Sequence, residues 1–416
     1  MSLIEECRTR VEYAIHALSR GVGQSAAREL RLQAALGWSL MQIKGSVSET
    51  RRAWSKVLEL AENLNDEEYQ LRAIWGLWVF HFNGGELRTA LTMARDAYEL
   101  AAKRGDPDDM IVGDRMAGSS HHYLGDQVGA RVHMERVLNY YVAPHRRSRD
   151  IRFVFNPRTS ARSYLARILW LQGFPNQAIR TSQTAIEDAE ATKHALSICN
   201  VLVQAACPIA FWIGDLEAGG RYVTRLLDCS QQHDLIAWHK WGCCYEGILH
   251  LQRGDTAKGL ELLGTALGEL PGIGYAVYRT AFLGAFAEAL AKAGQPGQGL
   301  AAIEEAIERS NDAEEHWCLA ELLRIKGEVL LRHGMARSAS DAEENFRESL
   351  LWARRQQTPS WELRTGTLLA RHFCNQNRPG EARNALAPVY ARFTEGFDTA
   401  DLTAAKQLLE HLADRP

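Results

Sequence analysis

The side chains of this 416-residue sequence that are best suited to chemistry are histidines, cysteines and arginines. His121 and His122 are adjacent, so on a helix they would point about 100° apart and could not hold one metal ion together. His239 and Cys243 have the i, i+4 spacing of one edge of a metal site, but two further ligands on the same face are missing. Ordinary buried or surface side chains explain both pairs better, so the sequence predicts no metal and no cofactor.

Catalytic patterns are equally weak. Ser/His/Asp catalysis has no GxSxG elbow to anchor it, and the charged residues, 24% of the chain, single out no carboxylate pair for acid–base work. Cys243 and Cys244 cannot act as a vicinal redox pair, because helical geometry separates adjacent thiols. The sequence therefore predicts a protein that is not an enzyme.

A short basic run, HRRSRDIR at residues 145–152, has the charge to hold a phosphate or an acidic partner. The alternative is a solvated loop whose arginines pair with Asp150 and with neighbouring helix ends. Isolated short basic runs are weak motifs, so the sequence favours the solvated loop.

Nine breaker residues, each ending an apolar helical run, mark the elements that must position these side chains: Gly45, Gly85, Gly125, Gly173, Gly214, Gly254, Gly294, Gly334 and Asn377. Their successive spacings are 40, 40, 48, 41, 40, 40, 40 and 43 residues. Glycine and asparagine tolerate positive φ, so each breaker is expected to close the first helix of a hairpin.

Small residues stand five positions after the breakers, where they would let the two helices of a hairpin approach closely: Thr50, Ala90, Ala130, Ala178, Gly219, Gly259, Gly299, Ala382 and, in the eighth hairpin, either Ala339 or, with a three-residue insertion, Ala342. The position seven before the breaker is also small, except that the first two hairpins have Trp38 and Trp78 there. In those two hairpins we expect looser or differently angled packing.

This pattern resembles the tetratricopeptide repeat (TPR), whose period is about 34 residues. It predicts an all-α, right-handed superhelical array of about nine TPR-like hairpins between about residue 24 and residue 393, with capping helices at both ends. No sustained period-2 runs flanked by turn residues indicate strands.

Prolines bracket the stretch 140–160, which predicts a division into N-terminal hairpins (1–143), an inter-repeat loop (144–157) and C-terminal hairpins (158–416). The capping helices are expected over about 4–20 and 399–413. The last one should begin at Asp398 or Thr399 and carry an apolar stripe of Leu402, Ala405, Leu408, Leu409 and Leu412.

The overall charge argues against nucleic acid as a direct ligand. The formal charge is −3 and the pI is near 6.5, so the chain lacks the positive excess that phosphate-backbone binding needs. Eight cysteines without CxxC spacing fit reduced thiols, and no uninterrupted apolar run of membrane-spanning length occurs. These features predict a soluble, cytoplasmic protein that binds no membrane.

Three stretches resemble one family: RFVFNPRTSARSYLARILWLQGFPNQAI, ELLRIKGEVLL followed by AEENFRESLLWARRQ, and SWELRTGTLLAR followed by APVYARFTEGFDTADLTAAKQLLEHL. They resemble the C-terminal helical-repeat region of bacterial predicted signal-transducing ATPases, in which a winged-helix DNA-binding or adenylate-cyclase-like domain and an ATPase module come first. The resemblance implies a sensor or scaffold arm with those domains as upstream partners. The sequence has no GxxxxGK[ST] loop and no Gly-Lys dipeptide, so ATPase activity is not carried over.

In TPR-like arrays the first helix of each hairpin lines an inner groove. Carrying the inward positions onto this sequence predicts a ligand-binding groove of mixed arginines and aromatic residues: Arg72, Trp75, Arg115, His122, Arg167, Trp170, Trp241, Arg324 and Arg371. Such a mixture suits an anionic or peptide ligand. The alternative is that several of the aromatic residues are ordinary core between hairpins.

The sequence therefore predicts a non-catalytic TPR-type module of a bacterial signalling or transcription regulator, which binds a protein or peptide partner or an anionic small effector. An alternative is a structural arm that brings regulators together as homo-oligomers. Arg115 and Arg167 are expected to face the inner surface near Trp170, where two guanidiniums beside an aromatic ring would favour an anion with a planar or apolar part.

Overall fold

The computed structural model describes residues 3–20, 25–140, 156–270, 277–334 and 338–413. Within these ranges every regular element is a helix and no strand occurs, which confirms the predicted fold class. Nine hairpins follow one another, and in all but the first the inner helix buries more of its residues than the outer helix does. A leading helix, α1 (Leu3–Ser19), and a final helix, α21 (Ala400–Ala413), flank them.

The inner helices are α2 (Ala26–Lys44), α4 (Glu67–Asn83), α6 (Pro107–Leu124), α8 (Pro157–Leu171), α10 (Ala195–Val201) continued by η2 (Leu202–Ala206) and α11 (Cys207–Ile213), α13 (Ile236–Gln252), α15 (Arg279–Lys292), α17 (Leu319–His333) preceded by η4 (His316–Cys318), and α19 (Pro359–Asn375). The outer helices are α3 (Ser48–Asn63), α5 (Leu87–Arg104), α7 (Gln127–Tyr140), α9 (Pro175–Thr192), α12 (Leu216–Gln232), α14 (Thr256–Glu269), α16 (Pro296–Asp312), α18 (Ser338–Arg355) and α20 (Pro379–Tyr390).

The breaker residues have the backbone geometry that their spacing predicts. All nine have positive φ, from 58° at Asn377 to 90° at Gly125. Each follows the inner helix of its hairpin within a few residues, where a left-handed residue lets the chain reverse direction. The periodicity read from the sequence is therefore the periodicity of the hairpins.

Close approach of the two helices in a hairpin depends on the small residue of the outer helix. A Cβ atom added at Gly259 would lie 2.6 Å from Cγ of Leu251 and 2.9 Å from the carbonyl oxygen of Gly247, both on the inner helix. In the eighth hairpin Ala342 is fully buried and Ala339 is exposed, so the register with the insertion is the right one.

A large side chain of the first outer helix packs against the first two inner helices, whereas the looser or differently angled packing expected in these hairpins stays a prediction. Trp54 of α3 is buried between Gly37 of α2 and Gly76 of α4, and a Cβ atom at either glycine would overlap its indole ring. The large side chain thus comes from the outer helix, and glycines one or two positions away from Trp38 and Trp78 make room for it.

The inner helix of the fifth hairpin contains a π-helical turn at residues 202–206. Pro208 cannot donate a backbone hydrogen bond inside this helix, and a wider turn just before it accommodates the missing bond. The stretch Ala195–Ile213 also has the length and hydropathy of a membrane span, but 72% of that window is buried inside the array. Its apolar character is that of a core helix.

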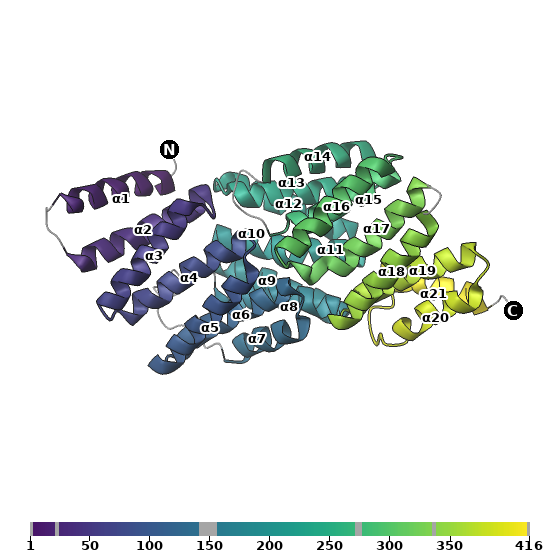
Figure 1. Cartoon of the computed structure of the whole chain (residues 1–416), viewed down its shortest axis with the longest axis horizontal. Coiled ribbons are helices and arrows are strands. Elements are labelled where there is room, and N and C mark those ends of the chain that lie inside the picture. The colour runs from purple at the N-terminus through teal and green to yellow at the C-terminus, as the bar shows by residue number, and fades with distance from the viewer. Residues whose placement is uncertain (1–2, 21–24, 141–155, 271–276, 335–337, 414–416) are drawn as a thin grey trace.

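The superhelix closes on itself, so that hairpins far apart in the sequence touch. The hydroxyl of Ser360 in α19 donates a hydrogen bond to the backbone carbonyl of Trp170 in α8, and the backbone N–H of Gln177 donates to Oε1 of Glu395 at 2.9 Å. Figure 1 shows the early hairpins at one end and the green and yellow ones at the other. The helices α8 and α19, which are far apart in the sequence, contact each other. One hydrophobic core runs from Leu71 to Trp361.

The predicted inter-repeat loop falls mostly outside the described residues, as does the basic run 145–152. The structure places the end of α7 at Tyr140 and the start of α8 at Pro157. The division of the chain at 144–157 therefore stays a prediction.

The last helix caps the array. Thr399 precedes it, and the Thr399 carbonyl accepts the first helical hydrogen bond from the Thr403 N–H at 2.9 Å, which identifies Thr399 as the N-cap. Of the predicted stripe, Leu402, Ala405 and Leu412 are buried, and Leu408 and Leu409 are half-buried against the same cluster.

The Gly259 contact yields a stability prediction. Gly259→Leu should lower the free energy of unfolding by about 1–3 kcal/mol, because the new side chain must displace Leu251 and the Gly247 backbone. Gly268→Leu, on the same helix, is the matched control: nothing lies within 4 Å of an added Cβ there, and replacing glycine favours the helix. Chemical denaturation measures both, and equal effects of the two substitutions would contradict the assigned packing.

Candidate ligand-binding pocket

A pocket of about 160 Å³ remains between the inner helices where the array closes. Its walls come from α8, α11, α13, α15, α17 and α19 and from the residues just before α15 and α17. The floor is aromatic and almost wholly buried, whereas the rim at Gln252, Ile248 and Ala285 is exposed or half-buried. The main lining residues are Arg167, Phe211, Trp212, Tyr245, Tyr278, Phe282, Trp317, Trp361, Glu288, Glu321 and Arg364.

Tryptophans from four hairpins build one wall of the pocket. The ring centroids of Trp170 and Trp212 are 4.5 Å apart, and those of Trp170 and Trp361 are 4.9 Å apart in an edge-to-face arrangement. Trp317 lies 6.2 Å from Trp212. These rings come from segments that the closure of the superhelix brings together, so the wall exists only in the closed array.

Arg167 is the one arginine of the pocket that has no carboxylate partner among the described residues. Its side chain is 2% exposed, and Nη1 donates to Oε1 of Gln204 at 2.9 Å and to the hydroxyl of Tyr123 at 3.3 Å. The guanidinium also lies 4.3 Å from the ring centroid of Trp317, and its Nε has no hydrogen-bond partner. The positive charge is held by neutral groups and aromatic faces.

The groups around Arg167 do not neutralise it directly. Burial raises the pKa of Tyr123, Tyr245 and Tyr278, so these phenols are uncharged at neutral pH. Burial also raises the pKa of Glu315, although Arg167 is close enough to lower it in part. Both carboxylate oxygens of Glu315 accept hydrogen bonds from other groups, the Thr280 hydroxyl at 2.7 Å and the Trp317 indole N–H at 3.0 Å.

Tyr278 lines the pocket in an unusual backbone conformation. Its φ is 76°, which is rare for an aromatic residue and costs conformational energy. Its ring packs 4.8 Å from that of Trp241 and 6.0 Å from that of Tyr123. A strained residue kept in place by its neighbours is common at binding sites.

Arg364, which lines the pocket, and Arg324, which lies behind its rim, are both paired with carboxylates. Arg324 contacts three carboxylates, those of Glu288, Glu321 and Glu328, at 2.8–3.2 Å. Arg364 pairs with Asp401 at 2.7 Å and with Glu321 at 3.2 Å, and donates to the Trp212 carbonyl. The rim charges are therefore paired with one another, whereas Arg167 on the floor has no carboxylate within ion-pair distance in the part of the chain that the structure describes.

Some of the predicted groove residues meet at this pocket. Arg167 lines it, Trp170 and Trp241 pack directly behind its aromatic walls, and Arg324 holds its rim acids. All four are buried. Trp170 and Arg167 contact Trp361 and Trp317 from across the superhelix, whereas Trp241 and Arg324 contact residues of their own and neighbouring hairpins.

The remaining predicted groove residues lie elsewhere. Arg115 is buried 5.2 Å from the ring of Trp78 and does not line the pocket, and burial lowers its pKa to about 10. His122 is buried beside Gln127, and burial lowers its pKa well below the usual value, so it is neutral. The three others, Trp75 in the second hairpin's core, Arg72 paired with Glu68, and exposed Arg371, are outside the pocket.

Sequence reasoning missed Trp212, Trp317, Trp361 and Tyr278 as pocket residues. A signal was present for two of them, since Tyr278 and Trp361, like Trp238, stand sixteen residues before the breaker of their hairpin. That recurrence marks the start of the inner helix, which the predicted groove positions did not include.

The metal and thiol candidates have ordinary surroundings. Nδ1 of His239 lies 3.2 Å from the Ser230 hydroxyl, and in the described part of the chain no three His, Cys, Asp or Glu side chains are grouped to hold a metal ion. All eight cysteines are free, and burial raises the pKa of Cys207 and Cys244, which disfavours reactive thiolates.

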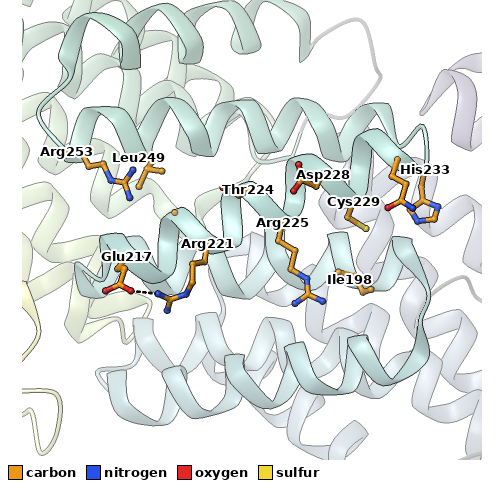
Figure 2. A pocket seen from close by; sticks show the side chains of 12 residues that line it. Ile198, Glu217, Arg221, Thr224, Arg225, Asp228, Cys229, His233, Leu249 and Arg253 are labelled. Carbon is orange, nitrogen blue, oxygen red and sulfur yellow. Dashed lines mark hydrogen bonds and ion pairs between the residues drawn. The ribbon is translucent and has the colours of Figure 1, made fainter.

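A larger groove of about 840 Å³ lies on the outer side, along α12 (Figure 2). Its arginines already have partners: Arg221 pairs with Glu217 at 2.7 Å, Arg225 pairs with Glu190, and Arg253 donates to a backbone carbonyl. Exposed, paired charges bind a further ligand weakly, because water and salt compete for them. The inner pocket is therefore the stronger candidate.

Comparisons with known proteins support the fold and leave the family open. No family model matches the chain. An uncharacterized protein of Rhizobium meliloti (strain 1021) is 23% identical over 350 residues, which cover 82% of this chain and 33% of that protein. The chain thus spans about one third of the length of the curated relative it matches. The resemblance to signal-transducing ATPases stays a hypothesis.

Two solved structures share the architecture. A Rap protein complexed with Competence and Sporulation Factor has a TM-score of 0.56 at 12% identity, covering 92% of this chain and 99% of that one. The Rap conjugation gene regulator of plasmid pLS20, in complex with the Phr* peptide, has a TM-score of 0.50 at 10% identity, covering 93% and 96%. The chain is, by fold, a TPR-like helical repeat solenoid.

The rim network yields a pH-dependent prediction. Burial alone would raise the pKa of Glu288, but Arg324 and Lys292 outweigh it and lower that pKa from 4.5 to about 2. Such a carboxylate stabilises the fold above its unfolded pKa, and the contribution is lost as the pH falls from about 4.5 toward 2. Arg324→Met should cost about 3 kcal/mol at neutral pH, because it removes the buried cation that three half-buried carboxylates share, and the cost should shrink on acidification.

Denaturant titrations from neutral pH down to about pH 3 measure this effect. Arg332→Met is the matched control, since Arg332 makes an exposed i, i+4 pair with Glu328 that is worth roughly 0.5 kcal/mol. A cost for Arg324→Met that stays constant across the pH range would show that the carboxylates are not held by this arginine.

Proposed function

We propose that this chain is a non-catalytic, TPR-type interaction module that senses an effector in its inner pocket and binds a protein or peptide partner. The observation that carries the proposal is the uncompensated Arg167, 2% exposed, in a pocket lined only by inner helices and the residues that precede them. A buried cation without a carboxylate partner costs several kcal/mol, and a ligand that supplies the missing anion recovers part of that cost.

The complexes of the two Rap proteins, one of them with a peptide, support the choice of partner class. Both share this fold at 10–12% identity, and their complexes are with Competence and Sporulation Factor and with the Phr* peptide. TPR-like arrays of this kind present concave, aromatic-rich surfaces, which suit extended segments of other chains. For this chain, a peptide or partner segment remains a proposal.

The size of the pocket limits how a peptide would enter. A volume of about 160 Å³ takes one side chain or terminus, whereas sites that bury whole drug-sized ligands are about 300–1,000 Å³. A longer segment would have to run along the rim at Gln252 and Ile248, or separate the contacts that close the array. Binding and closure are therefore coupled in this proposal.

The setting we propose is a bacterial signalling or transcription regulator with upstream ATPase and DNA-binding or cyclase domains. Its support is the resemblance of the GFDTADL-containing stretch and the match to one third of a longer relative. The competing role, a homo-oligomerisation arm, requires an association that does not depend on the pocket.

Peptide selection against the whole chain tests the proposed function. Display libraries should yield peptides whose affinity falls at least about tenfold in Ala285→Phe, which fills the half-buried entrance of the pocket. Ala301→Phe, at an exposed position on outer helix α16, is the matched control and should bind like the wild type. If no peptide is selected, or both variants bind equally well, the proposal is wrong.

A further inference from the structure

We infer that the inner pocket binds a monocyclic aromatic carboxylate, with the carboxylate on Arg167 and the ring between the tryptophans. This inference rests on the proposed function, because it names the chemical class of the effector. It concerns the pocket of Arg167, Trp212, Tyr278, Trp317 and Trp361 and assigns no role to the outer groove.

The charge of the ligand follows from Arg167. The guanidinium has no carboxylate within ion-pair distance among the described residues, and its Nε is buried with no hydrogen-bond partner. Gln204 and Tyr123 occupy only Nη1. A planar carboxylate matches the geometry of a guanidinium edge and forms charge-assisted hydrogen bonds that strengthen away from water.

The rim explains why the anion should be singly charged. Glu288 and Glu321 stand at the pocket with their charges balanced by Arg324, Lys292 and Arg364. A phosphate would bring up to two negative charges and three acceptor oxygens to a site with one free guanidinium. A monocarboxylate brings one charge to one cation, so the balance of the rim is unchanged.

The size and walls of the pocket define the rest of the ligand. Its volume, about 160 Å³, is close to that of a cavity of roughly 150 Å³ that takes up benzene, so one six-membered ring fits. Trp212, Trp317 and Trp361 offer ring faces and edges, and neighbouring aromatic rings in this wall already lie 4.5–6.2 Å apart. A ring at similar spacing gains aromatic contacts beyond its buried area.

Such a ligand would report on the closure of the array. Arg167 belongs to α8 and Trp361 to α19, the helices that meet where the superhelix closes. A molecule held by both stabilises the closed state relative to any state in which these helices separate. Effector binding would thereby change the surface that is offered to a partner.

Benzoate and phenylacetate are the probes, tested on the full chain by calorimetry and by thermal unfolding. Benzoate should raise the melting temperature of the wild type by about 2 °C or more at saturation. Benzamide has the same shape without the charge, and acetate has the charge without the ring; both should bind at least about tenfold more weakly. These comparisons use only the wild-type protein, so they hold even if a pocket variant does not fold.

Two arginine variants locate the site. Arg167→Met should weaken benzoate binding by about tenfold or more, and Arg167→Lys should recover part of the loss because it restores the charge without the planar fork. Arg115→Met is the matched control, since it removes another buried arginine that lies outside the pocket; benzoate affinity should not change.

The inference is overturned if benzoate does not bind, if benzamide binds as tightly, or if Arg167→Met retains wild-type affinity. Peptide binding that depends on Ala285 but is accompanied by no benzoate binding would overturn this inference and leave the proposed function standing. Benzoate binding without any selected peptide would support this inference and contradict the proposed function.

Discussion

The contact between the fourth and ninth hairpins determines the character of the whole inner surface. There the Ser360 hydroxyl bonds to the Trp170 carbonyl, and Gly396 lies so close to Pro175 that a Cβ atom would overlap the proline ring. In an open array the inner helices would line a groove filled with water. Because these hairpins meet, most of the groove becomes core, and a pocket of about 160 Å³ is what remains.

Because the inner surface is buried, the positive charges of its arginines lie away from water, and their surroundings differ from one arginine to the next. Arg324 is surrounded by three carboxylates, which compensates the cost of removing its charge from water. Arg115 lies against the face of Trp78, and burial lowers its pKa to about 10. Arg167 is hydrogen-bonded and stacked but has no carboxylate partner among the described residues, and unlike Arg115 it borders the pocket. Arg324 and Arg115 are therefore structural, whereas Arg167 is placed to bind an anionic ligand.

Local features of the fold could be predicted from the sequence, because they depend on single residues. A breaker such as Gly254 needs positive φ wherever the hairpin sits, and Gly259 must be small because two helices cross there. The cap helix follows from the stripe that includes Leu402. The packing of Trp54 against two glycines could not be predicted in the same way, since a large side chain from either helix of a hairpin can fill the space between them.

The pocket could be predicted only in part, since it depends on how far the superhelix turns. Small rotations between hairpins add up, and no single residue of the repeat determines whether α8 reaches α19. Arg167, Trp170, Trp241 and Arg324 lie on inner helices, but the inward positions did not predict that hairpins from across the axis would cover Arg167 and Trp170. Trp317 and Trp361 come from those covering segments.

The central claim, that the array is closed between the fourth and ninth hairpins, can be measured as a distance. Arg180 and Thr394 are exposed and stand next to Gln177 and Glu395, whose contact joins the two hairpins. Spin labels on non-natural amino acids at positions 180 and 394 avoid the native cysteines, and pulsed electron spin resonance gives their separation. The closed array predicts a single short distance with a narrow distribution, whereas a long or broad distribution would contradict the closure.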